Sequence, residues 1–321
     1  MIQFFIPNNQ SKFIKGFRQR SEPFCFCSPP IEWSNVMKFS KLLFSLTAIS
    51  MAFSAFAEHH ETSAVTDDVI KAQNAALVNA TEGKGFGPQS PRDISVKAGK
   101  NGRSFATAPA YKAMNLCNIH FHTNAEHKGG NFTKFAGNGD GNGHGTGFEY
   151  SGKLSASEKT KLEADVCTSG HGGLNAGDTV EVHFVHTTAQ VTPGPTLGAC
   201  LNENLSNPQL RVEAQVFVLV NNAKGADFNK FMEVGQRNGY HQALNIPANT
   251  GTPVQYAGST TGPSYNEKGS PLQVSWSVRP KAIKVSAESV GKWCNGNVFK
   301  EDHAHGVRNL VTDVNLLSKI K

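Results

Sequence analysis

The sequence contains no Cys-x-x-Cys motif, although its 321 residues include six cysteines. Cysteine-bound zinc sites and thioredoxin-type redox centres both use that spacing, so the sequence disfavours these two classes. It also has no internal repeat, no long low-complexity linker and no lipid-anchor motif. Its one long apolar run lies near the start of the chain. The folded part of the chain behind a short leader is therefore long enough for one large domain or two small ones.

Residues 37–57, MKFSKLLFSLTAISMAFSAFA, predict a secretory signal peptide. Lys38 and Lys41 precede a short apolar run that ends in the small-x-small pattern Ala-Phe-Ala. This run is too short and wrongly flanked for a membrane span. We therefore expect residues 1–36 to be an upstream extension and Glu58 to begin the mature chain. The protein would be periplasmic or secreted, with no membrane insertion after cleavage.

Removing this leader changes both the net charge and the cysteine count. Six of the 31 Lys and Arg residues and two of the 25 Asp and Glu residues precede Glu58, which leaves a net charge of +2 (25 − 23). A nucleic-acid partner is therefore not expected. An even number of cysteines in an exported chain predicts two disulfides, and all three pairings stay open. The four cysteines are Cys117, Cys167, Cys200 and Cys294.

Most of the remaining segments have the period-two alternation of β-strands, so we expect a mainly β fold with a few peripheral helices. One helix is expected over 64–80 and another over 157–166, where Ser155 and Glu158 form a capping box. Eight glycines in residues 129–147 predict a mobile loop inside the domain. The predicted strands cover 116–122, 179–186, 211–220, 272–279 and 281–286.

The segment CNIHFHTNAEHKGG, which begins at Cys117, is crowded with histidines. On a strand, His120 and His122 would point to one face, while Ile119 and Phe121 would point to the core. The same alternation places Cys117 on the core side. An H-x-H pair of this kind occurs both on exposed polar surface and in metal sites, so the pair alone leaves both interpretations open.

A second strand, TVEVHFVH, contains the further histidines that favour a metal site. Glu181, His183 and Val185 would share one face, and His186 would fall on the apolar side. The pleat therefore favours His183 over His186 as a partner for the first histidine pair. Two such strands can supply three imidazoles, which is the ligand set of a catalytic zinc site with a fourth position for water.

The histidine pattern also permits two alternatives to a zinc enzyme. His120-x-His122-x3-Glu126 has the spacing of the cupin signature, a two-histidine, one-carboxylate site suited to Fe or Mn in an oxygenase or isomerase. The glycines and the later histidine of that signature are absent from this sequence. The other alternative is an exported metal-binding module without catalytic activity.

Taken in order along the chain, these motifs resemble those of the carbonic anhydrases. IHFH followed by EH, and later VEVHFVH, resemble zinc-ligand strands of the alpha class, and the compact spacing in CNIHFHTNAEH is closer to the delta class. The resemblance implies a single domain over 58–321 with a large twisted, mostly antiparallel central sheet. Three further segments resemble that family: GFGPQSPRDI (85–94), YAGSTTGP (256–263) and VSWSVRPKAIKVSAES (274–289).

The resemblance implies a Zn²⁺ cofactor and reversible hydration of CO2 to bicarbonate and a proton by a metal-bound hydroxide. His120, His122 and His183 would be the zinc ligands. Three neutral imidazoles leave the full +2 charge at the site, which favours hydroxide over water. Glu181 would hold the second ring nitrogen of His183 and raise the basicity of that ligand.

The same resemblance implies the remaining site residues. Thr261 would accept a hydrogen bond from the hydroxide and donate its own proton to Glu126, and Val185 would line the CO2 pocket. Arg103 stands where alpha-class enzymes often have a proton-shuttling histidine, and arginine does not exchange a proton near neutral pH. Proton transfer would then use buffer or another histidine, such as His144.

A second H-x-H pair, His303 and His305, lies near the C-terminus. We interpret this pair as structural, because no ligand set accompanies it in the sequence. A second metal site, or a contribution to the first, is the alternative. His59, His60 and His171 are interpreted as tail or loop residues.

Overall fold

The computed structural model describes residues 64–221 and 225–321. The predicted upstream extension, the signal peptide and the start at Glu58 lie outside these residues. Within the described ranges, none of the helices combines the length and apolarity needed to cross a bilayer.

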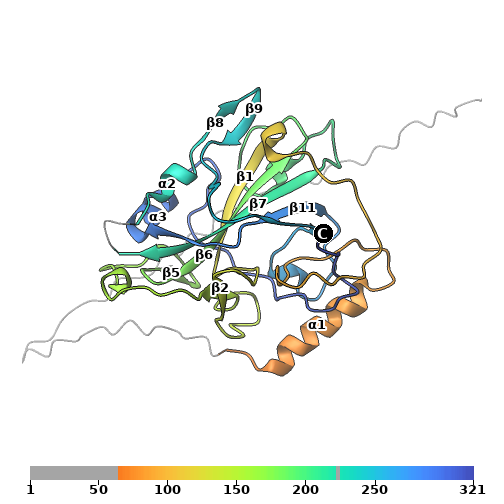
Figure 1. The fold of residues 1–321 in the computed structure, drawn as a ribbon, viewed down its shortest axis with the longest axis horizontal. Coiled ribbons are helices and arrows are strands. Elements are labelled where there is room, and N and C mark those ends of the chain that lie inside the picture. The colour runs from red at the N-terminus through yellow and green to blue at the C-terminus, as the bar shows by residue number, and fades with distance from the viewer. Residues whose placement is uncertain (1–63, 222–224) are drawn as a thin grey trace, which may run out of the picture. The chain divides into compact units, whose positions relative to one another are not determined.

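A six-stranded sheet forms the centre of the fold (Figure 1). Its strands are β1 (Asn115–Thr123), β6 (Thr179–Thr187), β7 (Leu210–Val220), β10 (Val254–Ser259), β11 (Gln273–Val278) and β12 (Ile283–Ser286). The order is β1-β6-β7-β11-β10, and β12 also pairs with β7. Pairing is antiparallel for β1–β6, β6–β7 and β10–β11, and parallel where β11 and β12 meet β7. The mainly β prediction is confirmed, and the parallel pairs make the sheet mixed.

The smaller elements surround this sheet. Three two-stranded ladders are formed by β2 (Phe132–Phe135) with β3 (Phe148–Tyr150), β4 (Val166–Ser169) with β5 (Gly172–Leu174), and β8 (Val234–Arg237) with β9 (Tyr240–Ala243). The helices are α1 (Asp67–Thr81), α2 (Phe228–Phe231) and α3 (Ala287–Cys294), with 3₁₀ turns η1 (Tyr111–Ala113), η2 (Ser157–Lys159), η3 (Leu197–Cys200) and η4 (Pro263–Tyr265). In Figure 1, α2 and α3 lie next to each other and α1 lies apart from them.

The predicted first helix agrees with α1, but the helix expected over 157–166 is wrong. The capping box forms, because the Ser155 N–H donates to Glu158 and the Glu158 N–H donates to the Ser155 hydroxyl. Only the 3₁₀ turn η2 follows it. The N–H of Leu162 donates instead to the Asn175 side chain, so a tertiary hydrogen bond replaces the next turn of helix.

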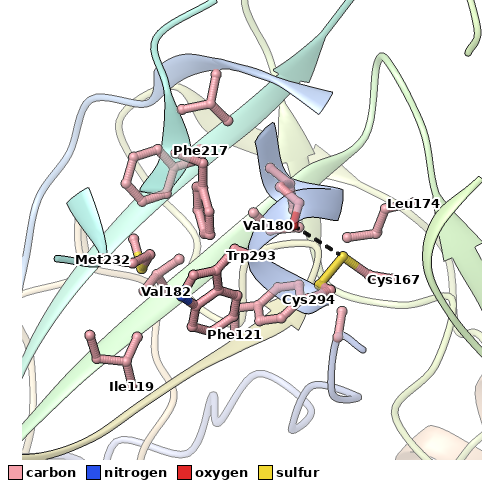
Figure 2. Packing of buried hydrophobic residues seen from close by; sticks show 14 of the residues in the cluster. Ile119, Phe121, Cys167, Leu174, Val180, Val182, Phe217, Met232, Trp293 and Cys294 are labelled. Carbon is pink, nitrogen blue, oxygen red and sulfur yellow. Dashed lines mark hydrogen bonds between the residues drawn. A yellow bond between two sulfur atoms is a disulfide. The ribbon is translucent and has the colours of Figure 1, made fainter. Parts of the chain in front are cut away.

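One face of the sheet packs against α3 and carries the larger apolar core (Figure 2). Phe121 of β1 meets Trp293 of α3 edge to face, with ring centroids 5.5 Å apart. Ile119 and Val182 lie in the same cluster and are fully buried. The period-two prediction that Ile119 and Phe121 face the core is therefore confirmed.

Cys117 is an exception to that alternation. The register of β1 on β6 shifts between Leu116 and Asn118, so Cys117 forms a β-bulge. Its side chain joins the apolar cluster on the opposite face of the sheet and bonds to Cys200. The prediction that Cys117 shares the core side with Phe121 is wrong for this reason.

The structure selects one of the three possible disulfide pairings. Cys117 bonds to Cys200, and Cys167 bonds to Cys294. The first disulfide ties β1 to η3, and the second ties β4 to α3 under the larger core. The prediction of two disulfides among these four cysteines is confirmed.

The glycine-rich segment 129–147 contains β2 and a hydrogen-bonded turn around Asp140. The Asp140 carboxylate accepts the N–H groups of Asn142 and His144. The carbonyl of Gly143 accepts the N–H of Val307. A Cβ atom at Gly143, whose φ is +101°, would lie 2.6 Å from the Val307 carbonyl oxygen, so only glycine permits this approach.

Candidate metal centre

Strands β1 and β6 bring three histidines to one point on the sheet. His120 lies directly opposite His183 in the register, and His122 lies opposite Glu181. The ring centroids are 5.1 Å apart for His120 and His183, 4.7 Å for His122 and His183, and 5.2 Å for His120 and His122. One nitrogen of each ring lies within 4.8 Å of one nitrogen of the other two. His186 points to the other side of β6, as the pleat predicts.

Each of these rings donates one N–H to a fixed acceptor. His120 Nδ1 lies 2.6 Å from the Asn118 side-chain oxygen, and His122 Nδ1 lies 2.9 Å from the carbonyl oxygen of Gly306. His183 Nε2 lies 3.1 Å from Glu181 Oε1. Since amide, carbonyl and carboxylate oxygens only accept, these three nitrogens carry the protons. The opposite nitrogens, Nε2 of His120 and His122 and Nδ1 of His183, therefore keep a free lone pair.

These three free nitrogens fit a metal ion. His122 Nε2 is buried without a hydrogen-bond partner among the described residues. His120 Nε2 and His183 Nδ1 lie 3.3 Å apart, and with the tautomers above neither can donate to the other. A buried lone pair without a donor is costly, and a shared cation satisfies all three at once. The donor set, three imidazoles, is the one that zinc accepts in catalytic sites.

A second group, His127, Glu181 and His183, also has atoms close enough to hold a metal. Its atoms are already paired, because His127 Nδ1 lies 2.7 Å and His183 Nε2 lies 3.1 Å from Glu181 Oε1. A metal there would replace existing hydrogen bonds. The triad of His120, His122 and His183 is therefore the better candidate.

Burial keeps His120 and His122 neutral. Burial, followed by the charges of His183 and His122, holds the pKa of His120 well below its usual range. Burial also lowers the pKa of His122 to about 4, against the raising effect of Glu126. Neutral imidazole is the form that binds metal, so the folded site is prepared for binding near neutral pH.

His127, for which sequence reasoning found no role, belongs to a buried network behind His183. Glu181 accepts the N–H of His127 at Oε2 and its Nδ1 proton at Oε1. The Tyr256 hydroxyl lies 2.6 Å from His127 Nε2 and 3.0 Å from the Ser90 hydroxyl. Burial raises the pKa of Tyr256, so its phenol stays a donor. The strand pattern carried no signal for His127, because this residue follows the end of β1.

Glu181 is ionised at the centre of this network. Burial alone would raise its pKa, but the electrostatic attraction of His127 and hydrogen bonds from His127 and His183 place it well below the usual range. A carboxylate fixed in this way holds His183 in one tautomer and orientation.

Glu126 lies beside the triad but faces a nitrogen that is already protonated. Glu126 Oε1 is 3.7 Å from His122 Nδ1 and accepts the N–H of Arg308 at 3.0 Å. Its Oε2 is buried without a hydrogen-bond partner among the described residues. Since the free nitrogen of His122 is Nε2, the two-histidine, one-carboxylate cupin arrangement does not form here.

The two other predicted site residues, Thr261 and Val185, have no side-chain hydrogen bond to the triad among the described residues. Thr261 is half-buried just after β10 and makes no hydrogen bond to Glu126 among the described residues. Thr260 is buried, and its hydroxyl lies 2.5 Å from that of Ser270. Val185 is 2 % exposed and lies two positions after His183 in β6, in the apolar cluster of the triad side. Arg103 lines a separate cavity of about 370 Å³.

The fold and site together are a mixed β-sheet with three histidines whose free nitrogens are close enough to hold one metal ion. The sequence profile of the delta carbonic anhydrases matches residues 111–289, more than half of the chain. The chain belongs to the delta carbonic anhydrase family, and its enzyme class is carbonic anhydrase. No curated protein sequence matches it significantly.

Solved carbonic anhydrase structures show distant similarity. A halotolerant enzyme from Dunaliella salina is 17% identical, with 76% of this chain and 93% of that chain covered and a TM-score of 0.32. A hyperthermostable enzyme from a hydrothermal vent chimney is 15% identical, with 71% and 84% covered and a TM-score of 0.26. The alpha-class enzyme of Photobacterium profundum is 17% identical, with 77% and 95% covered and a TM-score of 0.25.

Proposed function

We propose that this protein catalyses the reversible hydration of CO2 to bicarbonate with a Zn²⁺ ion held by His120, His122 and His183. One observation carries the proposal: three separately fixed tautomers leave three lone pairs without a donor, on nitrogens within 4.8 Å of one another. Zinc bound by neutral imidazoles supplies a Lewis acid that makes water nucleophilic at neutral pH. Side chains of the protein would orient the reacting water and receive CO2.

Glu126 and Thr261 would orient the reacting water. Arg308 fixes one oxygen of Glu126 through its backbone N–H, which leaves Oε2 free to accept a hydroxyl proton. Thr260 is occupied by Ser270, which favours Thr261 as the donor. A threonine hydroxyl has one proton, and here that proton would be donated to the Glu126 carboxylate. The threonine oxygen could then only accept a hydrogen bond from the reacting water, which orients that water for attack.

Val185 would form part of the apolar surface that receives CO2. It shares the face of β6 with His183, and its side chain is buried on the triad side of the sheet. CO2 carries no net charge or hydrogen-bond donor, so an apolar wall beside the metal suits it.

We further propose that the protein works outside the cytoplasm, in the periplasm or after secretion. The predicted signal peptide of residues 37–57 and the two disulfides support this location, because disulfides persist in oxidising compartments. Residues 58–321 would form the mature single-domain enzyme.

The test is CO2 hydration by stopped flow, with zinc analysis, on protein purified from a host that exports and oxidises it. The matched pair is His122→Ala, which removes a ligand, and His241→Ala, which removes a histidine of the β8–β9 hairpin. We expect about one zinc per chain and full activity in wild type and His241→Ala, and loss of both in His122→Ala. Wild-type protein with one zinc per chain and no hydration would contradict the proposal.

A further inference from the structure

Four further histidines lie beyond the triad, on the side of His120 and His122. The His305 ring centroid is 6.0 Å from the centroids of both His120 and His122. The His303 ring is 5.6 Å beyond His305. His144 stacks on His171 with centroids 3.6 Å apart and ring planes within 4°. His305 and His303 therefore continue from the triad as neighbouring groups, and His144 and His171 form a stacked pair.

Backbone contacts between three separate segments build this cluster. The N–H of His305 donates to the Phe121 carbonyl and the Thr123 N–H donates to the His305 carbonyl, which fixes the C-terminal segment along β1. The glycine-rich segment joins that segment where the Val307 N–H donates to Gly143. The turn between β4 and β5 supplies His171. The cluster is thus held by the fold and not by loose side chains alone.

The rings nearest the triad already reach solvent, since the side chains of His305 and His303 are 44% and 41% exposed. His303 and His144 are half-buried, and His171 is exposed. His144 follows Gly143, whose carbonyl accepts the Val307 N–H, so its chain segment lies beside the segment of His303 and His305.

His305 Nε2 lies 2.7 Å from Glu301 and His303 Nδ1 lies 2.5 Å from Asp302, so in each ring the other nitrogen is the one open to proton exchange. Because His305 also contacts His120 and His122, we do not assign it the exchanging proton. Imidazoles at this spacing can pass protons directly or through single water molecules.

The proposed reaction, CO2 + H2O → HCO3⁻ + H⁺, releases one proton for each bicarbonate formed. We propose that His303, His144 and His171 accept this proton and carry it to solvent. The inference rests on the proposed function. A ring nitrogen of a neutral imidazole takes the proton through water and becomes imidazolium. It then gives that proton to a buffer base, which restores the neutral ring for the next turnover.

The charges around His144 suit this role. Burial and then the neighbouring His171 lower the pKa of His144, Asp140 opposes that effect, and His303 and His305 lower it further. Two imidazoles stacked at 3.6 Å cannot both be charged without strong repulsion. The pair therefore takes up at most one additional proton readily and releases it to solvent.

The test compares wild type with His144→Gln/His171→Gln/His303→Gln, and uses His241→Gln as the matched control. CO2 hydration is measured in dilute and in concentrated buffer, and again with added imidazole. We expect the triple variant to lose roughly 10- to 100-fold in kcat in dilute buffer, in line with the contribution of positioned proton acceptors. Its kcat/KM stays unchanged, and imidazole restores kcat. The control behaves as wild type throughout.

A second readout does not depend on activity. NMR titration of the His144 ring in the zinc-free protein should give a higher pKa in His171→Gln than in wild type, because a neighbouring positive charge has been removed. Zinc content should stay at about one per chain in the triple variant.

Three results would overturn the inference. The first is an unchanged kcat of the triple variant in dilute buffer. The second is a parallel fall in kcat and kcat/KM without imidazole rescue, which would make these histidines structural. The third is a drop in bound zinc, which would make the cluster a metal site. A zinc-loaded wild type without any hydration contradicts the proposed function itself, and the inference falls with it.

Discussion

At the scale of single residues, the site depends on which nitrogen of each histidine is protonated. Three acceptor oxygens determine this protonation. They are the side-chain amide oxygen of Asn118, the backbone carbonyl of Gly306 and the carboxylate of Glu181. Asn118 precedes His120 by two positions in β1, so both side chains lie on the same face of the strand. The sequence therefore contained a signal for Asn118 that the histidine pattern alone did not reveal.

The carboxylate is expected to matter most for metal affinity. Glu181→Gln weakens the acceptor behind His183 and lets that ring adopt the other tautomer. Zinc affinity, measured by competition with a chelator, should fall by about 10- to 100-fold. Glu158→Gln, which changes a half-buried glutamate of η2 that pairs with Lys284, is the matched control and should leave the affinity unchanged. Equal affinity in the two variants would contradict the role given to Glu181.

His186 makes a separate prediction about stability and pH. Its ring is fully buried, its Nε2 has no partner among the described residues, and burial lowers its pKa to about 3. The unfolded chain, with a histidine pKa of about 6.5, takes up the proton first as the pH falls. Stability from this group is therefore present above about pH 6.5 and is lost between there and the folded pKa.

The size of this pH effect follows from the difference between the pKa of His186 in the unfolded chain and in the folded protein. Between pH 7.5 and pH 5, His186 should cost about 2 kcal/mol of the free energy of unfolding. Urea denaturation of wild type and His186→Phe at both pH values measures it. The fall in stability should be smaller in the variant by about that amount. An identical fall in both proteins would show that His186 does not titrate in this way.

At the scale of strands and helices, the sequence was most informative where side chains alternate regularly. The strand ranges and the facing of His120 and His183 follow from a period of two, which needs only one chain segment at a time. The bulge at Cys117 breaks that period without any change in residue type, so it could not be read in advance. The helix expected after Ser155 failed because a partner distant in sequence, Asn175, takes one of its hydrogen bonds.

The two disulfides allow the site to be separated from the rest of the fold. Cys117 lies three positions before His120, whereas Cys167 bonds to Cys294 in the core on the opposite face. Each bond closes a long loop, so removing either should lower the free energy of unfolding by roughly 2–5 kcal/mol. Cys117→Ala/Cys200→Ala should also weaken zinc binding, because it loosens the ligand strand.

The other pair is the matched control. Cys167→Ala/Cys294→Ala should lower stability by a similar amount and leave zinc affinity as in wild type. Urea denaturation and chelator competition on both double variants measure the two effects. A loss of zinc affinity in the control alone would contradict the assignment of Cys117 to the site.

At the scale of the whole molecule, the function depends on residues far apart in the sequence. The acceptor for His122 is Gly306, and the partner of Glu126 is Arg308, both near the C-terminus. The second H-x-H pair, interpreted from the sequence as structural, lies beside the triad at His305. Local patterns could identify the histidine strands, but not which distant segments close over them. The disulfide pairing stayed open for the same reason.

The central claim is that His120, His122 and His183 hold a zinc ion. Zinc-edge X-ray absorption on the purified protein tests it most directly, with His122→Ala beside wild type. We predict three imidazole nitrogens and one oxygen at about 2.0–2.1 Å in wild type, and loss of that coordination in the variant. Sulfur ligands, an octahedral oxygen shell, or the same spectrum in both proteins would contradict the account.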